Sequence, residues 1–136
     1  MKLRLVASTP ALETLIAVAM LTTTSGATPS NLFNSLSVKP EKVKDIVGRL
    51  EVQHGNILEH NRLSWLLEAE EGEVLKVLVR NHFFSFTRLS ARNWLVSSNL
   101  RAVLEYKSEG DEFSEKLFES IKSVAPVVHD VGGRTH

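Results

Sequence analysis

The chain has 136 residues, 43% of them hydrophobic, which fits one globular domain with a single buried core. Sixteen basic and sixteen acidic side chains cancel, so no overall charge draws the protein to nucleic acid or to an anionic membrane. The absence of cysteine excludes disulfides, thiolate nucleophiles and thiolate metal ligands, and oxidative chemistry would therefore need a bound cofactor.

The N-terminal segment alternates apolar and polar residues from Lys2 to Ala7, which predicts a strand. Thr9 and Pro10 then have the form of a helix cap followed by proline in the first turn. An alternative is a secretory signal, because basic residues precede the apolar run 15–21. Pro10 and Glu13 interrupt the approach to that run, so we favour a helix in a cytoplasmic protein.

The middle of the chain contains the clearest strand of the sequence, since residues 62–69 alternate strictly. Before it, Thr28 and Pro29 open a short turn or helix, and Pro40 begins a helix with one apolar face. After it, residues 74–79 are almost all apolar, which predicts a buried helix that ends at the edge of a cleft.

The C-terminal part begins with residues 81–93, which have no sustained period and are predicted to form a site loop or short strand. Ser97 or Ser98 could cap the next helix, and a last helix precedes Pro126. We therefore predict an α+β fold in which a small twisted antiparallel sheet packs against helices. Residues 1–128 would form this single domain, and residues 129–136 a frayed tail.

Cationic and aromatic side chains are interleaved in the second half of the chain. Guanidinium groups bind phosphate in a bidentate manner and aromatic faces cover flat rings, so this mixture suits a phosphorylated ligand with a ring. The same groups could also bind RNA. A third possibility is an ordinary solvated surface over a core of phenylalanines, which would have the same composition. The residues are Arg80, His82, Phe83, Phe84, Phe86, Arg88, Arg92, Trp94 and Arg101.

Two other chemistries find little support in the spacing. His54, Glu59, His60 and His82 carry metal-ligating groups, but the His-Glu-x-x-His helix pattern is absent, so no metal site is predicted. Ser90 could belong to a hydrolase triad, yet no nucleophile-elbow sequence surrounds it.

Three segments, in this order, resemble the flavin-dependent thymidylate synthase family. Residues 54–60 read His-Gly-Asn-Ile-Leu-Glu-His and resemble the family's His-Gly-x-x-x-x-Glu-His element, with three residues where that element has four. In the second segment, Arg80-Asn81-His82 is followed by seven residues and then by Ser90, with Arg92 two positions later. This is similar to the family's signature, in which Arg-His-Arg is followed by seven residues and a Ser. Residues 94–102 resemble a third element of the family, which consists of an aromatic residue, two apolar residues, two small residues and then Asn-x-Arg. The resemblance covers about residues 1 to 125.

The resemblance implies that reduced FAD supplies a hydride and methylene-tetrahydrofolate a carbon to convert dUMP to dTMP, in a homotetramer whose sites lie between subunits. By matching positions it implies a flavin site lined by Thr22, His54, Asn56, Glu59, Arg80, Asn81, His82, Asn99 and Arg101. It also implies nucleotide contacts from Arg88, Ser90 and Arg92, of which Ser90 and Arg92 would be catalytic. From the balanced charge we expect contact neither with a membrane nor with nucleic acid.

The chain departs from the family's pattern at several positions. Asn81 and His82 replace a His and an Arg, which removes a fixed cation, and Arg88 stands where Gln or Glu is usual. The long insertion that normally follows Arg92 is missing, as are a second Arg and a Gln-Trp-Glu-Ile stretch after Arg101. We therefore predict an FAD-binding homologue with weak or altered activity. The alternative is a non-enzymatic nucleotide- or RNA-binding or regulatory protein that uses the same cationic cleft.

Overall fold

The computed structural model describes residues 1–22, 26–50 and 56–134. The strands within these residues form one antiparallel sheet in the order β1-β2-β4-β3. They are β1 (Lys2–Ser8), β2 (Leu63–Glu68), β3 (Ser85–Arg88) and β4 (Asn93–Ser98). The sheet therefore joins the N-terminal segment to the second half of the chain.

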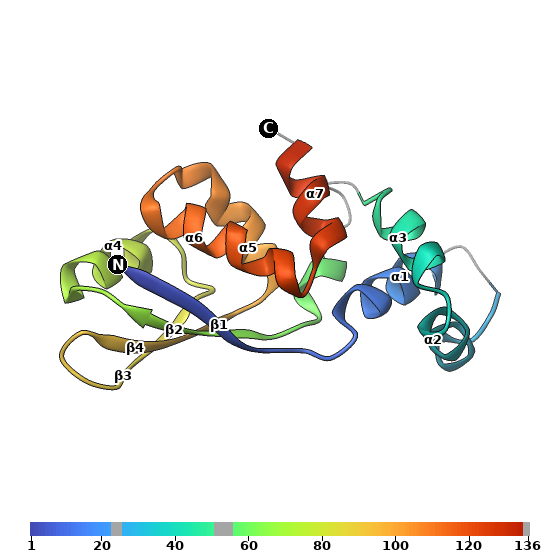
Figure 1. Ribbon diagram of the computed structural model, residues 1–136, viewed down its shortest axis with the longest axis horizontal. Coiled ribbons are helices and arrows are strands. Elements are labelled where there is room, and N and C mark those ends of the chain that lie inside the picture. The colour runs from blue at the N-terminus through green and yellow to red at the C-terminus, as the bar shows by residue number, and fades with distance from the viewer. Residues whose placement is uncertain (23–25, 51–55, 135–136) are drawn as a thin grey trace.

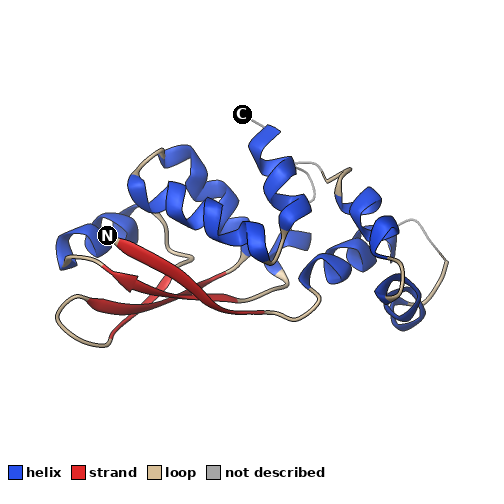
Figure 2. Cartoon of the chain, in the orientation of Figure 1, coloured by secondary structure: helices blue, strands red, loops and turns tan. Residues whose placement is uncertain are grey.

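The helices gather on one face of the sheet and beyond one of its ends (Figures 1 and 2). They are α1 (Leu12–Thr22), α2 (Pro29–Ser37), α3 (Pro40–Val47), α4 (Glu71–Arg80), α5 (Leu100–Tyr106), α6 (Glu112–Ser120) and α7 (Pro126–Arg134), with short 3-10 turns η2 (Ile57–Glu59), η3 (Lys107–Glu109) and η4 (Ile121–Ser123). In Figure 1, α4, α5 and α6 lie over the sheet, whereas α1, α2 and α3 form a separate group and α7 stands between the two sets. The predicted α+β fold is thus confirmed.

Alternation along β2 decides which face of the sheet is buried. Leu63, Trp65 and Leu67 point into the core, and the indole Nε1 of Trp65 donates to Ser120 Oγ on α6 at 2.8 Å. A buried tryptophan needs such a partner for its N–H group. This bond fixes α6 over the centre of the sheet.

The first helix begins later than the sequence predicts. Thr9 does not cap it, because Thr9 pairs with Arg62 and so extends the contact between β1 and β2: Thr9 N donates to Arg62 O at 2.9 Å and Arg62 N donates to Thr9 Oγ1 at 2.8 Å. The chain then turns through Ala11, whose φ is 51°, and α1 starts at Leu12. The prediction of a cap at Thr9 with Pro10 in the first turn is therefore wrong.

The other two proline-led starts are confirmed. Thr28 caps α2, since its Oγ1 accepts a hydrogen bond from Asn31 N at 3.4 Å, and α2 runs beyond the predicted short turn to Ser37. Pro40 is the first residue of α3. Proline is tolerated at this position because the first turn of a helix does not use its N–H groups.

Helix α4 differs from the predicted buried helix. Val74 and Val77 are buried, but Leu75 and Val79 are exposed. Helix α4 therefore has apolar residues on two sides, and only the side with Val74 and Val77 packs against the core. Residues 81–93, predicted to be a loop or short strand, contain β3 and the turn that joins it to β4.

Two details at the C-terminal end also differ from expectation. Asn99, and not Ser97 or Ser98, caps α5, because Ser98 Oγ instead donates to Phe83 O at 2.7 Å. Helix α7 continues to Arg134 with Val131 and Gly132 buried, so residues 129–134 are helical where a frayed tail was expected. None of the helices in the described ranges has the length and apolar character that a membrane crossing needs.

Candidate functional site

Arg101 connects two of the three sequence motifs. Its Nη1 donates to Asn56 Oδ1 at 3.3 Å and forms a short ion pair with Glu59, while its Nε donates to Glu105 Oε1 at 3.0 Å. We call Asn56, Glu59, Arg101 and Glu105 the Arg101 cluster. Hydrogen bonds, first with Glu105 and then with Glu59, raise the pKa of Arg101 above its ordinary value, which keeps the guanidinium charged.

A buried asparagine holds the two halves of the Arg101 cluster in place. Asn61 Nδ2 donates to Leu58 O at 2.8 Å in η2, and Asn61 Oδ1 accepts from Leu100 N at 2.9 Å at the start of α5. Asn61 is only 6% exposed, so both bonds are shielded from water. The position of Arg101 relative to Glu59 is therefore set by the core and not by the surface side chains alone.

Asn99 lies two residues before Arg101, and its amide serves the backbone. Asn99 Oδ1 accepts from Ala102 N at 3.0 Å, which satisfies one of the free N–H groups at the start of α5. The Nδ2 group, which donates hydrogen bonds, does not take part in this cap. The side chain can therefore cap the helix and present a donor at the same time.

One predicted flavin contact, Thr22, lies in an N-terminal helix. Thr22 is the last residue of α1, and its Oγ1 donates to Ala19 O at 3.1 Å. Helix α1 packs against η2, which carries Glu59. His54 lies outside the described residues.

Arg80 is held elsewhere. Its Nη1 lies 3.1 Å from Asp111 Oδ2 and 3.6 Å from Glu109 Oε2, just before α6. Tyr106 Oη also donates to Asp111 Oδ2, at 3.1 Å, and burial together with the Asp111 charge raises the pKa of Tyr106 to about 12. Arg80 thus pairs with residues beyond the C-terminal end of α5, whereas Arg101 lies in its first turn.

The two residues after Arg80 take part in the link to β3. Asn81 ends α4, and its Oδ1 accepts from Phe83 N at 2.7 Å. The side chain of His82 is exposed. The described part of the chain therefore does not bring this motif to the Arg101 cluster.

Arg88, Ser90 and Arg92, which we call the hairpin cluster, surround the turn between β3 and β4. The Arg88 guanidinium lies 5.1 Å from the centre of the Trp94 ring, and its Nη1 lies 3.5 Å from Glu71 Oε2. Arg88 also donates to Ser90 O at 3.3 Å and to Ala91 O at 3.0 Å. Ser90 Oγ accepts from Asn93 Nδ2 at 2.7 Å. Arg92 forms a short ion pair with Glu70 and lies 4.0 Å from Glu68.

The two clusters lie at opposite ends of the sheet. The hairpin cluster precedes Asn93, the first residue of β4, and Arg101 follows Ser98, the last. Six residues of strand span roughly 17 Å at about 3.4 Å per step. A ligand that contacted both clusters of one chain would therefore have to span this distance.

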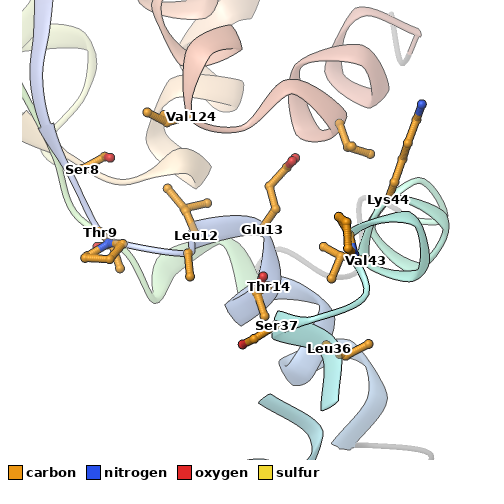
Figure 3. A pocket seen from close by; sticks show the side chains of 14 residues that line it. Ser8, Thr9, Leu12, Glu13, Thr14, Leu36, Ser37, Val43, Lys44 and Val124 are labelled. Carbon is orange, nitrogen blue, oxygen red and sulfur yellow. The ribbon is translucent and has the colours of Figure 1, made fainter. Parts of the chain in front are cut away.

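A separate hollow of about 380 Å³ lies where the β1–α1 turn meets the α2–α3 junction and α7 (Figure 3). Glu13 is its acidic side chain, and Glu13 Oε2 accepts from Val128 N in the first turn of α7 at 2.9 Å. Burial raises the pKa of Glu13 above its ordinary value, and this effect outweighs the hydrogen bonds from the backbone of Val128 and Val127, which lower the pKa. No residue predicted from the motifs lines this hollow.

Metal binding finds no candidate in the part of the chain that the structure describes. No three histidine, aspartate or glutamate side chains gather there in a way that could hold an ion. Of the metal-ligating residues considered from the sequence, Glu59 forms an ion pair with Arg101. His82 lies in the link between α4 and β3.

The fold is similar to that of a solved protein structure. The crystal structure of a UMP/dUMP methylase, PolB, from Streptomyces cacaoi, bound with 5-Br dUMP, aligns with a TM-score of 0.69. The alignment covers 96% of this chain and 93% of that chain, at 12% sequence identity. At this identity the similarity shows the shared fold alone. No protein-family model matches the chain, and no curated protein matches it by sequence.

The sequence motifs did not identify two residues of the site. Glu105 lies four residues after Arg101, a spacing at which oppositely charged side chains meet on a helix, so it could have been found. Asn61 gives no such signal. Its role depends on the packing of η2 against α5, which no local pattern reveals.

Proposed function

We propose that the protein is a nucleotide-binding homologue of the flavin-dependent thymidylate synthases that binds FAD at the Arg101 cluster and has weak or altered activity on dUMP. The observation that carries the proposal is the contact of Arg101 with Asn56 and Glu59, because it unites two family-like segments that are far apart in sequence. The fold shared with a UMP/dUMP methylase supports a nucleotide ligand.

The cluster suits the ring of a flavin better than its diphosphate. Asn56, Glu59 and Asn99 offer hydrogen-bond acceptors and donors of the kind that recognise the polar edge of an isoalloxazine. A diphosphate needs convergent cations, yet Arg101 already faces two carboxylates and Arg80 lies beyond the other end of α5. We therefore assign only the ring to this cluster; a bound reduced flavin would supply the hydride.

Weak activity follows from the state of the hairpin cluster. Arg88 and Arg92 would contact the nucleotide phosphate, but each is already paired with a glutamate. A phosphate must displace these carboxylates, and part of the binding free energy is lost in doing so. Dimer or tetramer formation, which the family resemblance implies, would bring this cluster of one chain to the flavin site of another.

The nucleic-acid alternative is not favoured by any observation. The arginines of the predicted cationic cleft each face at least one carboxylate within 4 Å; they are Arg80, Arg88, Arg92 and Arg101. A surface that tracks a nucleic-acid backbone needs uncompensated positive charge.

The absorption spectrum of freshly purified protein, followed by titration with FAD, tests the proposal. We expect flavin absorbance or FAD uptake in the wild type, and a loss of about tenfold or more in FAD affinity for Arg101→Gln. Arg49→Gln is the matched control, because Arg49 forms an exposed i,i+4 pair with Asp45 on α3 and should leave affinity unchanged. A wild-type protein that takes up no FAD would refute flavin binding.

A further inference from the structure

The hollow beside Glu13 joins three parts of the chain that lie far apart in sequence. It is lined by the β1–α1 turn, by the junction of α2 and α3, and by the first turn of α7 (Figure 3). Its volume of about 380 Å³ falls in the range of small-molecule sites, roughly 300–1,000 Å³. Leu12, Leu36 and Val43 line it and belong to the core, so part of its wall is apolar. The hollow therefore has room for a small ligand with an apolar portion.

Glu13 brings a negative charge to the wall of this hollow. Its side chain is half-buried, and burial is the largest cause of its raised pKa. In the part of the chain that the structure describes, the groups that act on this pKa include no basic side chain, and the one other charge among them, Asp130, is also negative. Buried charges in proteins are normally paired, because the loss of hydration is costly. Within the described residues, no cation balances the Glu13 carboxylate.

The contact between Glu13 and α7 does not require this charge. Glu13 Oε2 accepts from Val128 N at 2.9 Å, and the carbonyl oxygen of a glutamine amide would accept the same hydrogen bond. A carboxylate at the start of a helix gains from the helix dipole, yet the pKa of Glu13 is raised, so burial outweighs that gain. Relative to its protonated form, ionised Glu13 lowers stability. A perturbed carboxyl group in a hollow is a candidate for ligand binding.

The groups around the hollow select the charge of a ligand. Lys44 also lines it, but Figure 3 shows the Lys44 side chain extending from α3 away from Glu13. Lys44 is exposed, so its ammonium group keeps its hydration. An anion in the hollow would meet the Glu13 carboxylate. A metal ion is disfavoured as well, because no three carboxylate or histidine groups gather within the described ranges.

We propose that this hollow binds a small organic ammonium ion, whose charged group pairs with Glu13 and whose apolar chain lies against Leu12, Leu36 and Val43. An ammonium group has three N–H donors, and a carboxylate that accepts hydrogen bonds from the backbone of Val128 and Val127 has further acceptor positions. Contact with the cation offsets the cost of the buried charge. The inference concerns a different part of the chain from the Arg101 cluster and does not rest on FAD binding.

Titration of the isotope-labelled full chain with two matched compounds, followed by two-dimensional NMR, tests the proposal. Butylamine and 1-butanol share the same apolar chain, but only the amine is charged at pH 7. We expect saturable shifts with butylamine in the backbone amides of residues 8–14 and 36–44, and at least tenfold weaker binding of 1-butanol. A wild type that shows no saturable binding of butylamine, or binds both compounds equally, would overturn the proposal.

A substitution at Glu13 tests the role of the charge. Glu13→Gln keeps an acceptor for Val128 N, so this variant should stay folded and should bind butylamine at least tenfold more weakly. Glu41→Gln is the matched control, because Glu41 is exposed in the first turn of α3 and does not line the hollow. Circular dichroism checks the fold of both variants. Equal butylamine affinity in the two variants would overturn the proposal.

A second substitution changes the space in the hollow and leaves Glu13 as it is. Ser37 is an exposed lining residue, so Ser37→Phe should fill part of the hollow without disturbing the core. We expect weaker binding of butylamine by this variant. Ser35→Phe is the control, since Ser35 is exposed on the same helix and does not line the hollow. Unchanged affinity in Ser37→Phe would show that the amine binds elsewhere and would overturn the assignment.

Discussion

The Arg101 cluster and the hairpin cluster use the same chemistry in different ways. In both, an arginine pairs with glutamates at the protein surface. Arg101, however, contacts residues of a distant segment that buried Asn61 ties to α5, whereas Arg92 contacts residues just before α4. Exposed ion pairs contribute little by themselves, so the buried anchor is what distinguishes the two. The comparison indicates that a buried anchor positions Arg101, whereas Arg92 is held by exposed ion pairs alone.

The largest effect should come from removal of that anchor. Asn61→Leu leaves Leu58 O and Leu100 N without partners in the core, which should lower the free energy of unfolding by about 2–4 kcal/mol. Urea unfolding measures the loss, with Asn34→Leu at an exposed site of α2 as the control. Equal stability of the two variants would remove the proposed difference between the clusters.

The next effect concerns Tyr106, which lies with Arg80 at the far end of α5. Its pKa is raised from 10.0 to about 12, so the folded state favours the neutral phenol. Stability from this shift is fully present below pH 10 and should be lost as the pH rises through 12. The chain has one tyrosine, so phenolate absorbance reports this group alone. A midpoint near 10 in the folded protein would contradict the buried contact with Asp111.

A smaller effect separates the two roles of Asn99. Asn99→Ala removes the cap of α5 and should cost about 1 kcal/mol of stability in thermal or urea unfolding. Asn99→Asp keeps an acceptor oxygen and should restore stability, but it has lost the amide donor and should not restore FAD affinity. Recovery of both properties by aspartate would show that the side chain acts only as a cap.

The smallest effect is expected in the hairpin cluster. Arg92→Gln breaks exposed ion pairs with Glu70 and Glu68 and should change the free energy of unfolding by less than about 1 kcal/mol. FAD affinity should stay the same, since Arg92 lies at the other end of the sheet. A large loss of FAD affinity, measured by the titration used for Arg101→Gln, would place the flavin at the hairpin instead.

The sequence predicted features that local pattern determines. Strict alternation identified β2, and proline positions located the starts of α2 and α3. Thr9 was misassigned because it pairs with Arg62, 53 residues away, and such a contact leaves no mark in the local sequence. The exposed side of α4 was missed for a similar reason, since an apolar run does not reveal which side has a neighbour.

The same distinction applies to the site. The motifs grouped Asn56, Glu59 and Arg101 as candidate residues, and Arg101 contacts both of the others. They also placed Arg80 in that group, and it pairs instead with Asp111. A motif records which residues occur together, but only tertiary packing decides which of them meet within one chain. Whether Arg80 reaches a flavin from a neighbouring subunit stays a prediction.

Hydrogen exchange with and without FAD tests the central claim most directly. The account predicts slower exchange of backbone amides in residues 56–62 and 99–105, which carry the Arg101 cluster and its anchor. Residues 88–93 at the hairpin should exchange as fast with FAD as without it. Protection at the hairpin with none near Arg101 would contradict the account.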